Sequence, residues 1–255
     1  MLFLVGVGLA NDDISMRAAS ALKRGKLYID AYTSFIDSNR LAFIERIAGK
    51  SVSRLSRSDM EENAGRLVNE AKVSDVVIAV GGDPLIATTH KILAIEAEKL
   101  GVEMEVIHAP SIVTAAIGES GLDFYRFGAV CTVPMWREHY KPVAFYDTIY
   151  GNYGTNKHSL LLLDYSSESN SSMPVGEALR ILEEAEKSHG KGLINGDTKV
   201  IAMASIGMAA EQKLYGKISS MKAQSFGTGP AVLIVPAKLE SIERESMAAL
   251  HVSEI

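Results

Sequence analysis

The sequence predicts an α/β protein with a mostly parallel sheet in its N-terminal half and a second, mixed α/β domain after it. Two observations lead to this prediction. Short apolar runs alternate with helical patterns in the first half, whereas irregular segments join most strand candidates of the second half. We therefore expect an N-terminal domain at residues 1–126 and a C-terminal domain at residues 127–255, with binding loops at the carboxyl ends of the parallel strands.

In the first half, each strand candidate leads through a turn into a helical pattern. The expected strands are Leu2–Val7, Lys26–Asp30, Asp75–Val80 and Val102–Ile107, and the expected helices are Ile14–Lys23, Ala42–Ala48, Met60–Lys72, Thr88–Leu100 and a short one from Ser111 to about Ile117. Gly49 and Gly101 mark two helix ends, because glycine readily takes the left-handed conformation that follows a last turn. This alternation is typical of βαβ units.

The second half combines strand candidates with one clear helix and one long loop-like run. The expected strands are Ala129–Val133, Ser159–Leu163, Lys199–Ser205 and Ala231–Val235, and the expected helix runs from Pro174 to about Lys187. The run from Met135 to Lys157 is rich in Tyr, Pro and Gly, so we predict an irregular connection there. Such long connections are usually functional or contact a partner.

Composition and charge argue against several classes of protein. The chain carries 26 Lys and Arg against 31 Asp and Glu, a formal net charge of −5, without the basic stripe that direct nucleic-acid binding requires. The one cysteine, Cys131, cannot form an internal disulfide, so we expect a cytoplasmic protein. No apolar run approaches the roughly 20 residues that cross a bilayer, so no membrane association is expected. The histidines show no spacing typical of zinc ligands, and no metal is implied.

The glycine-rich turn GVGL, Gly6–Leu9, directly follows the first expected strand. Glycines let a ligand approach the backbone, and the helix that follows favours negative charge at its N-terminus. A dinucleotide fingerprint needs a third glycine where Asn11 stands, although Asp30 ends a strand as a ribose-binding acid would. A nicotinamide or flavin site is therefore disfavoured, and a plain structural turn stays open.

Two more turns follow expected strands. In VGGDPL, Val80–Leu85, the acid Asp83 either contacts a ligand or caps its own turn, and the two interpretations have about equal weight. The HAPSI sequence, His108–Ile112, taken alone is a common helix-capping step. Hydrolase and kinase classes lack support, because the chain has no GxSxG elbow and no P-loop lysine, and Cys131 lies in an apolar strand pattern.

Taken together, the motifs resemble those of the archaeal-type diphthine synthase family within the tetrapyrrole methylase superfamily, through nearly the whole chain. They are GVGL, YTS at Tyr32–Ser34, LSR at Leu55–Arg57, GGDPLIATTH at Gly81–His90, HAPSI, the SGL and YRFG pair within Ser120–Gly128, and IVPAKL at Ile234–Leu239. The glycine motifs alone indicate only the superfamily. ATTH followed by HAPSI is more specific to the diphthine branch.

The resemblance implies the two-domain tetrapyrrole-methylase fold with a ligand cleft between the domains, a homodimer, and S-adenosylmethionine as methyl donor. It also implies a protein acceptor, translation elongation factor 2. The family methylates the amino group of a 3-amino-3-carboxypropyl chain on a histidine of that factor, a step of diphthamide biosynthesis that forms diphthine. Methyl transfer to an amine depends mainly on alignment of donor and acceptor, so no catalytic residue or general base can be named.

Carried over by position, the family's donor-binding residues share a largely apolar character, which favours shape and backbone hydrogen bonding. They correspond to Leu9, Asp83, Ile86, Ser111, Ile112, Leu163, Ile206 and Ala231. The sequence departs from the family at two places. Ser205 stands where the family has an arginine, and Gly229–Ala231 stands where a Pro-Pro-His segment is usual. The roles of that arginine and histidine cannot be transferred.

Asp83 is also a candidate electrostatic neighbour of the cationic donor. Two other functions stay open: a methylase for a tetrapyrrole or precorrin, and a donor-binding module without catalysis.

Overall fold

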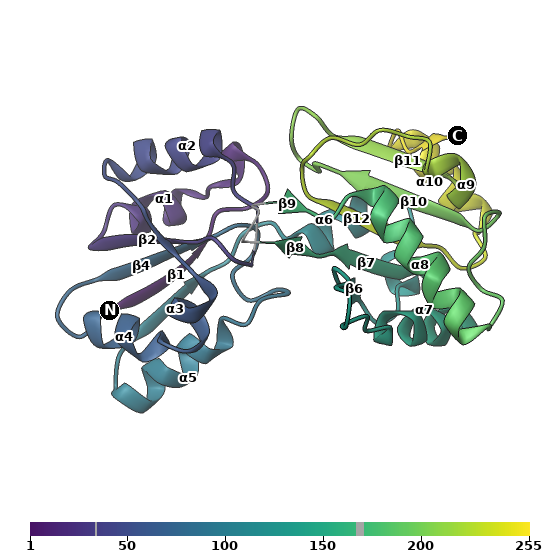
Figure 1. Cartoon of the computed structure of the whole chain (residues 1–255). Helices are drawn as coiled ribbons and strands as arrows, with labels where there is room; N and C mark the ends of the chain where they lie inside the picture. The colour runs from purple at the N-terminus through teal and green to yellow at the C-terminus, as the bar shows by residue number, and fades with distance from the viewer. Residues whose placement is uncertain (34, 167–170) are drawn as a thin grey trace. The chain divides into compact units, whose positions relative to one another are not determined.

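The computed structural model describes residues 1–33, 35–166 and 171–255 (Figure 1). Ser34, the last residue of the YTS motif, lies outside the described residues. The chain forms two compact units, the first holding Met1–Ile112 and the second Val113–Ser166 with the described residues from 171 onward. The predicted domain boundary after residue 126 stays a prediction. Within the described residues, no helix is long and apolar enough to cross a membrane.

The first unit is built on a parallel sheet, as predicted. Its strands are β1 (Leu2–Gly6), β2 (Lys26–Asp30), β3 (Ser53–Leu55), β4 (Val76–Val80) and β5 (Met104–Ile107), in the order β3-β2-β4-β1-β5. The expected strands are confirmed, and β3 is an addition that sequence reasoning missed. Because all neighbouring pairs are parallel, the turns after β1, β4 and β5 leave the sheet at the same edge.

Helices cover both faces of this sheet, with α1 and α2 on one face and α3 to α5 on the other (Figure 1). They are α1 (Met16–Leu22), α2 (Ser38–Ala48), α3 (Arg57–Glu61), α4 (Ala64–Glu70) and α5 (Lys91–Leu100), with the 3-10 turn η1 (Asn11–Asp13) before α1. The expected single helix at Met60–Lys72 is wrong, because Asn63 leaves the helical conformation and divides it. Helix α2 begins before the expected Ala42, since the Asp37 side chain caps it.

Strand β1 shows why both faces need a cover. Its side chains alternate between two hydrophobic clusters, with Phe3 and Val5 packed on the α1 and α2 side and Leu2 and Leu4 on the α3 to α5 side. All of them are buried. A strand that is apolar on both faces is typical of a parallel sheet between two helical layers.

The second unit is built on a mixed sheet, in agreement with the predicted α/β character. Its main strands are β6 (Cys131–Val133), β7 (Ser159–Leu163), β10 (Lys199–Ala204), β11 (Gln212–Lys217), β12 (Ala231–Val235) and β13 (Ser253–Glu254), in the order β13-β11-β10-β12-β7-β6. A small separate ribbon joins β8 (Tyr165–Ser166) and β9 (Ser171–Ser172). The pairs of β10 with β11 and β12, and of β12 with β7, are antiparallel.

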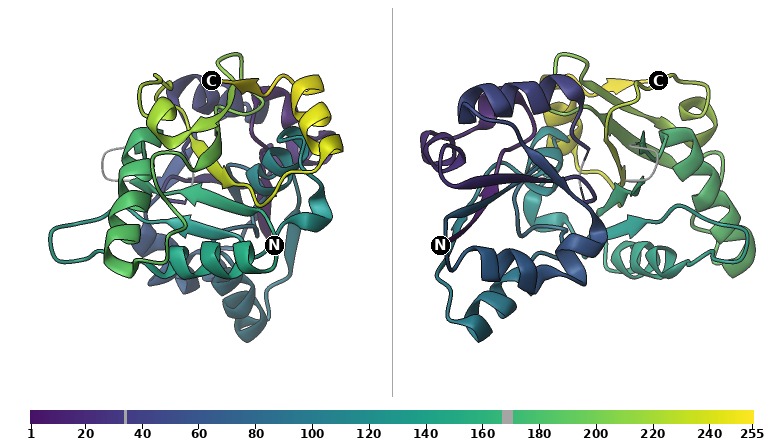
Figure 2. Two further views of the ribbon diagram at one scale, coloured as in Figure 1. Left: turned by 90° about the vertical axis from the view of Figure 1, so that its right-hand side faces the viewer. Right: turned by 60° about the vertical axis from the view of Figure 1, so that its left-hand side comes forward.

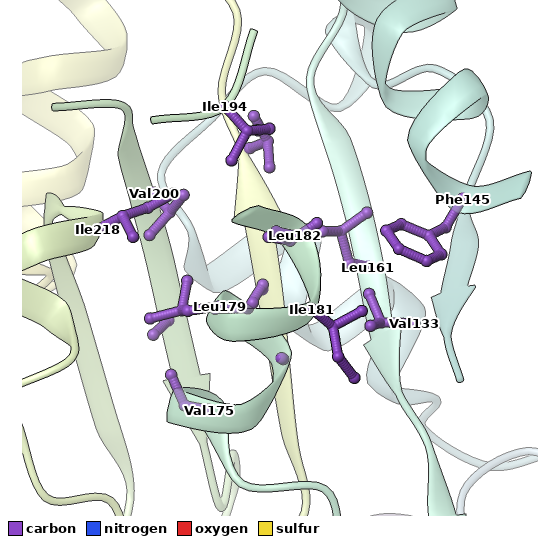
Figure 3. Close-up of a cluster of buried hydrophobic side chains, with 14 of the residues drawn as sticks. Val133, Phe145, Leu161, Val175, Leu179, Ile181, Leu182, Ile194, Val200 and Ile218 are labelled. Carbon is purple, nitrogen blue, oxygen red and sulfur yellow. The ribbon is translucent and has the colours of Figure 1, made fainter. Parts of the chain in front are cut away.

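Helix α8 supplies much of this unit's core. The helices of the unit are α6 (Ile112–Glu119, beginning at the unit boundary), α7 (Ala144–Gly154), α8 (Val175–His189), α9 (Ile218–Met221) and α10 (Ser241–Ala249), with the 3-10 turn η2 (Phe124–Arg126). From α8, Val175, Leu179 and Leu182 point toward the sheet strands that carry Leu161 and Val200 (Figure 3). The helix expected from Pro174 is confirmed, and it ends at Gly190 in the left-handed conformation.

Helix α7 corrects the prediction of an irregular run at Met135–Lys157. Its buried residues Phe145, Tyr146, Ile149 and Asn152 recur at helical spacing, so two aromatic residues of this run lie on the inner face of a helix, whereas Tyr150 and Tyr153 of the same helix are exposed. Outside α7, residues 155–157 and the part before Ala144 are irregular. That segment projects from the unit as a narrow loop between β6 and α7 (Figure 2), with Arg137 and Tyr140 paired across it.

Candidate active site

The turns after β1 and β4 are joined by backbone hydrogen bonds. The Gly8 N–H donates to the Gly82 carbonyl at 3.3 Å, and the Gly82 N–H donates to the Gly8 carbonyl at 2.8 Å. A Cβ atom on Gly6 would lie 2.8 Å from Ala109 Cβ and 2.9 Å from Pro84 Cδ. Glycine is therefore required at position 6 because three loops of the chain meet there. This close packing supports the interpretation of Gly6 as part of a structural turn.

Asp83 lies at the centre of this edge and is buried. One carboxylate oxygen accepts the Leu85 N–H at 3.0 Å. The other contacts His108 Nδ1 at 2.8 Å and accepts the Ala109 N–H at 3.3 Å. The side chain therefore caps its own turn and also ties it to the HAPSI turn after β5.

Arg40, which sequence reasoning missed, fixes the GVGL turn through hydrogen bonds to its backbone. Its buried guanidinium donates to the carbonyls of Val7 at 2.6 Å and Gly8 at 2.7 Å, and also to that of Leu9. Burial lowers the pKa of Arg40, and nearby Asp13 partly opposes this. Arginine shares the inner face of α2 with Ile44 and Ala48. A charged residue at a core-facing helical position was the signal available in the sequence.

The predicted donor-binding residues of the first unit lie on these turns. Asp13 accepts the Leu9 N–H at 2.7 Å and so fixes that backbone. Ile86 is 47% exposed, a large apolar side chain open to a partner or ligand at the end of the β4 turn. Ser111 is buried, and α6 begins directly after it at Ile112. Together with Asp83, these residues occupy loops at the carboxyl edge of the first sheet.

The other three predicted positions gather at one edge of the second sheet. Leu163 ends β7, Ala231 begins β12 opposite Ala204, and Ile206 lies just after β10. The structure thus groups five predicted positions on the first unit and three on the second.

The two departures from the family pattern touch each other. The Ser205 N–H donates to the Pro230 carbonyl at 2.9 Å, and a Cβ on Gly229 would collide with the Ser205 hydroxyl. Ser205 itself has a positive φ of 54°. The replacement at position 205 and the altered segment at 229–231 therefore form one local arrangement. Within the described residues, no group of three or more His, Cys, Asp or Glu side chains is placed to hold a metal.

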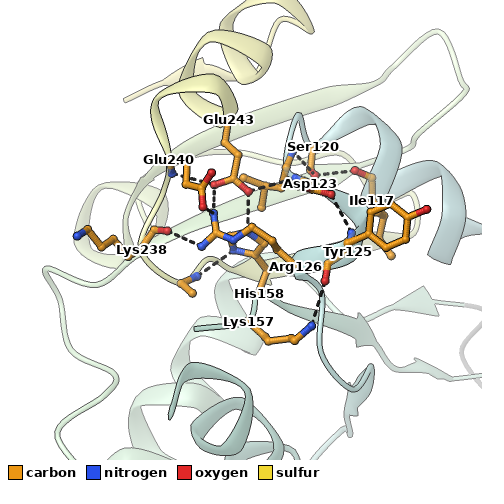
Figure 4. Close-up of polar contacts among 12 residues, drawn as sticks. Ile117, Ser120, Asp123, Tyr125, Arg126, Lys157, His158, Lys238, Glu240 and Glu243 are labelled. Carbon is orange, nitrogen blue, oxygen red and sulfur yellow. Dashed lines mark hydrogen bonds and ion pairs between the residues drawn. The ribbon is translucent and has the colours of Figure 1, made fainter. Parts of the chain in front are cut away.

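A buried polar network braces the second unit (Figure 4). His158 Nδ1 accepts the Ala237 N–H at 3.0 Å, so its Nε2 carries the proton and donates to Glu243 at 2.9 Å. Arg126 pairs with the other Glu243 oxygen. Burial lowers the pKa of His158, and Glu243 only partly opposes it. His158 is therefore a neutral histidine.

This network predicts a loss of stability in mild acid. Below the ordinary histidine pKa of 6.5, the unfolded chain takes up a proton that folded His158 does not bind. Stability is therefore complete above pH 6.5 and falls as the pH drops below it, by up to about 1.4 kcal/mol per pH unit. Urea unfolding between pH 8 and 5 measures this slope. His158→Gln should flatten it, and an unchanged slope in that variant would assign the effect to other groups.

Comparison with known proteins places the chain in a family. The model of the tetrapyrrole (corrin/porphyrin) methylases matches residues 1–222. The diphthine synthase of Methanocaldococcus jannaschii is 36% identical over 254 residues, covering 98% of both chains. That of Methanothermobacter thermautotrophicus is 36% identical over 253 residues, covering 98% of this chain and 95% of the relative.

A solved structure agrees with these relatives. A crystal structure of diphthine synthase superposes with a TM-score of 0.84 at 32% identity, covering 98% of this chain and 96% of the other. The match includes both α/β units and thus supports the predicted fold class. The chain belongs to the diphthine synthase family of the tetrapyrrole methylases.

Proposed function

We propose that this chain is an S-adenosylmethionine-dependent N-methyltransferase that methylates the 3-amino-3-carboxypropyl-histidine of translation elongation factor 2 and so forms diphthine. The observation that carries the proposal is the 36% identity to a diphthine synthase along almost the entire chain. The clustered turns at the carboxyl edge of the first sheet support it, because parallel α/β sheets bind ligands at that edge.

We propose that the donor is bound at the eight positions inferred from the family. Exposed Ile86 offers an apolar surface, and the backbone of the turn at Leu9 is fixed because Asp13 accepts the Leu9 N–H. Asp83 contributes negative potential beside a cationic donor, although its oxygens already accept bonds from Leu85 and Ala109. We further propose that the protein is cytoplasmic and forms a homodimer. Sedimentation at micromolar concentration tests the dimer.

The chemistry needs alignment more than acid or base catalysis. When bound, the donor supplies a methyl group whose bond to the sulfonium breaks as the bond to the acceptor nitrogen forms, leaving a neutral thioether. The acceptor amine must lose its proton before each transfer. The turns braced by Arg40 and Asp83 hold their backbone groups in fixed positions. Such preorganisation supplies much of the rate increase in reactions of this kind.

A labelling experiment tests the function directly. The chain is incubated with methyl-labelled S-adenosylmethionine and elongation factor 2 that carries the aminocarboxypropyl histidine. Label is expected on that factor and not on a factor with an unmodified histidine. A tetrapyrrole or precorrin is offered in parallel. Label on the small molecule alone would reassign the chain to the small-molecule methylases. No label on either acceptor would indicate a donor-binding module without catalysis.

We also propose that the acceptor protein contacts the loop between β6 and α7. Val133 pairs with Leu163, so the loop leaves the second sheet beside a proposed donor position. The Met135 N–H is held by Asp164 at 2.8 Å, and half-buried Trp136 donates to the Pro142 carbonyl at 3.1 Å. These contacts anchor the base of the loop while its outer residues stay exposed.

Charge reversal of this loop should weaken acceptor binding. Arg137 and Lys141 are exposed cations, and the acceptor group carries a carboxylate. In Arg137→Glu with Lys141→Glu, we expect the kcat/KM for protein methylation to fall at least about tenfold, equivalent to about 1.4 kcal/mol. Donor affinity should not change. Lys72→Glu with Lys23→Glu, exposed residues of the first unit, serves as the charge-matched control. Equal losses in both variants would assign the effect to net charge.

A further inference from the structure

Asp30 and His90 form a buried pair that the donor-site positions do not include. Neither side chain has exposed surface, and His90 Nε2 lies 3.3 Å from an Asp30 carboxylate oxygen. Nε2 makes no hydrogen bond at this distance, so the contact is one of proximity inside the core. Because Asp30 is fully buried, the sequence-based comparison with a ribose-binding acid does not describe its role.

The hydrogen bonds of Asp30 show that it is ionised. Its oxygens accept the Tyr32 N–H at 2.9 Å and the Thr33 N–H at 3.2 Å, and also the Thr33 hydroxyl. Burial favours the neutral acid, but His90 and these donors outweigh it, so the pKa of Asp30 lies below its ordinary value.

His90 joins Asp30 to the β4 turn through its two ring nitrogens. Its Nδ1 is 2.9 Å from the Pro84 carbonyl oxygen, which can only accept, so Nδ1–H is the donor of that hydrogen bond. Its Nε2 faces the Asp30 carboxylate.

The Pro84 carbonyl is the point at which this pair acts on the β4 turn. It accepts both His90 Nδ1–H and the Thr88 hydroxyl, the latter at 2.8 Å. Ala87 lies between Pro84 and Thr88 in the same turn. Its φ of 57° is uncommon for a residue other than glycine and costs on the order of 1 kcal/mol. A strained turn persists only when its surroundings hold it.

We infer that His90, held by Asp30, is a positioning residue for methyl-donor binding, because its Nδ1–H fixes the turn that carries Asp83 and Ile86. This inference rests on the proposed donor role of those two residues. His90 has no exposed surface, so it acts through the turn and not by contact with the donor. Its contribution is the shape of the turn, which a side chain without a donor at the position of Nδ1 would release.

Two amide substitutions distinguish the roles of the two ring nitrogens of His90. Asparagine places its amide near the position of Nδ1, and glutamine places its amide near that of Nε2. We expect His90→Asn to bind S-adenosylhomocysteine within about threefold of wild type, whereas His90→Gln loses roughly tenfold or more. Calorimetry measures the affinity, and thermal unfolding of each variant measures stability. A merely structural role would make affinity follow stability, not the nitrogen that is replaced.

The outcomes separate the inference from the proposed function. If wild type binds neither S-adenosylmethionine nor its demethylated product, the proposed function fails. If wild type binds and the Asn and Gln variants bind equally well, only the positioning role fails. Should both variants unfold, ¹⁵N spectra of His90 in wild type decide: a hydrogen-bonded proton on Nδ1 supports the inference, and an unprotonated Nδ1 overturns it.

Discussion

Gly82→Val is expected to weaken S-adenosylmethionine binding on the order of 100-fold, equivalent to about 2.7 kcal/mol. Gly82 has a φ of 71°, which a β-branched residue adopts only at considerable cost. A Cβ there would meet only the Pro110 oxygen, at 3.9 Å, so the effect comes from the backbone rather than from a clash. Relaxation of that backbone would break its paired hydrogen bonds with Gly8 and move Leu9.

Calorimetry with folded protein measures this loss, and two variants calibrate it. Asp83→Asn keeps the shape and part of the hydrogen bonding, so we expect a smaller loss of affinity. Gly101→Val imposes the same strain at a φ of 64°, at the end of α5 with open space around it. It should lower stability and leave donor affinity unchanged. If folded Gly82→Val binds the donor as wild type does, the turn has no part in binding.

Glu243→Ala is expected to destabilise the protein by about 3 to 5 kcal/mol, because it leaves buried His158 and the partly buried Arg126 without their shared partner. Glu243 also accepts the Glu240 N–H at 2.9 Å and the Asp123 N–H at 3.2 Å. One side chain therefore joins α10 to the start of η2 and to the residue before β7. All these contacts lie inside the second unit.

Chemical denaturation gives the size of this effect. Glu245→Ala, an exposed site two residues further along α10, is the matched control, and its change should stay within about 0.5 kcal/mol. Similar losses in the two variants would mean that helix α10, and not the network, determines the stability. Donor binding at low temperature should survive in both variants as long as they are folded.

The sequence was sufficient to predict elements whose apolar pattern is strong. Strands β2, β7 and β12 begin and end at the predicted residues, because each is a short apolar run between clear turns. Strand β3 was missed, since only Leu55 of its three residues is buried and no apolar run exists to detect. Helix α10 was missed for a related reason: its buried positions include Glu243, so its inner face does not look apolar.

At the candidate site, sequence patterns located the turns but not the bonds that hold them. The positions of GVGL, VGGDPL and HAPSI after parallel strands placed them at one edge, which the structure confirms. The pairing of Asp30 with His90 spans 60 positions and depends on tertiary packing. Asp83 could not be assigned from spacing, because capping and ligand contact require the same residue at the same turn.

The strand order of the first unit also affects how the chain folds during its synthesis. β1 is the first strand to leave the ribosome, yet its neighbours β4 and β5 are completed only at Val80 and Ile107. At a translation rate of about 5–20 residues per second, β1 waits roughly 5 to 20 seconds for its second partner. During this interval an apolar strand with at least one unpaired edge is exposed, which makes it a target for chaperones and for aggregation at high expression.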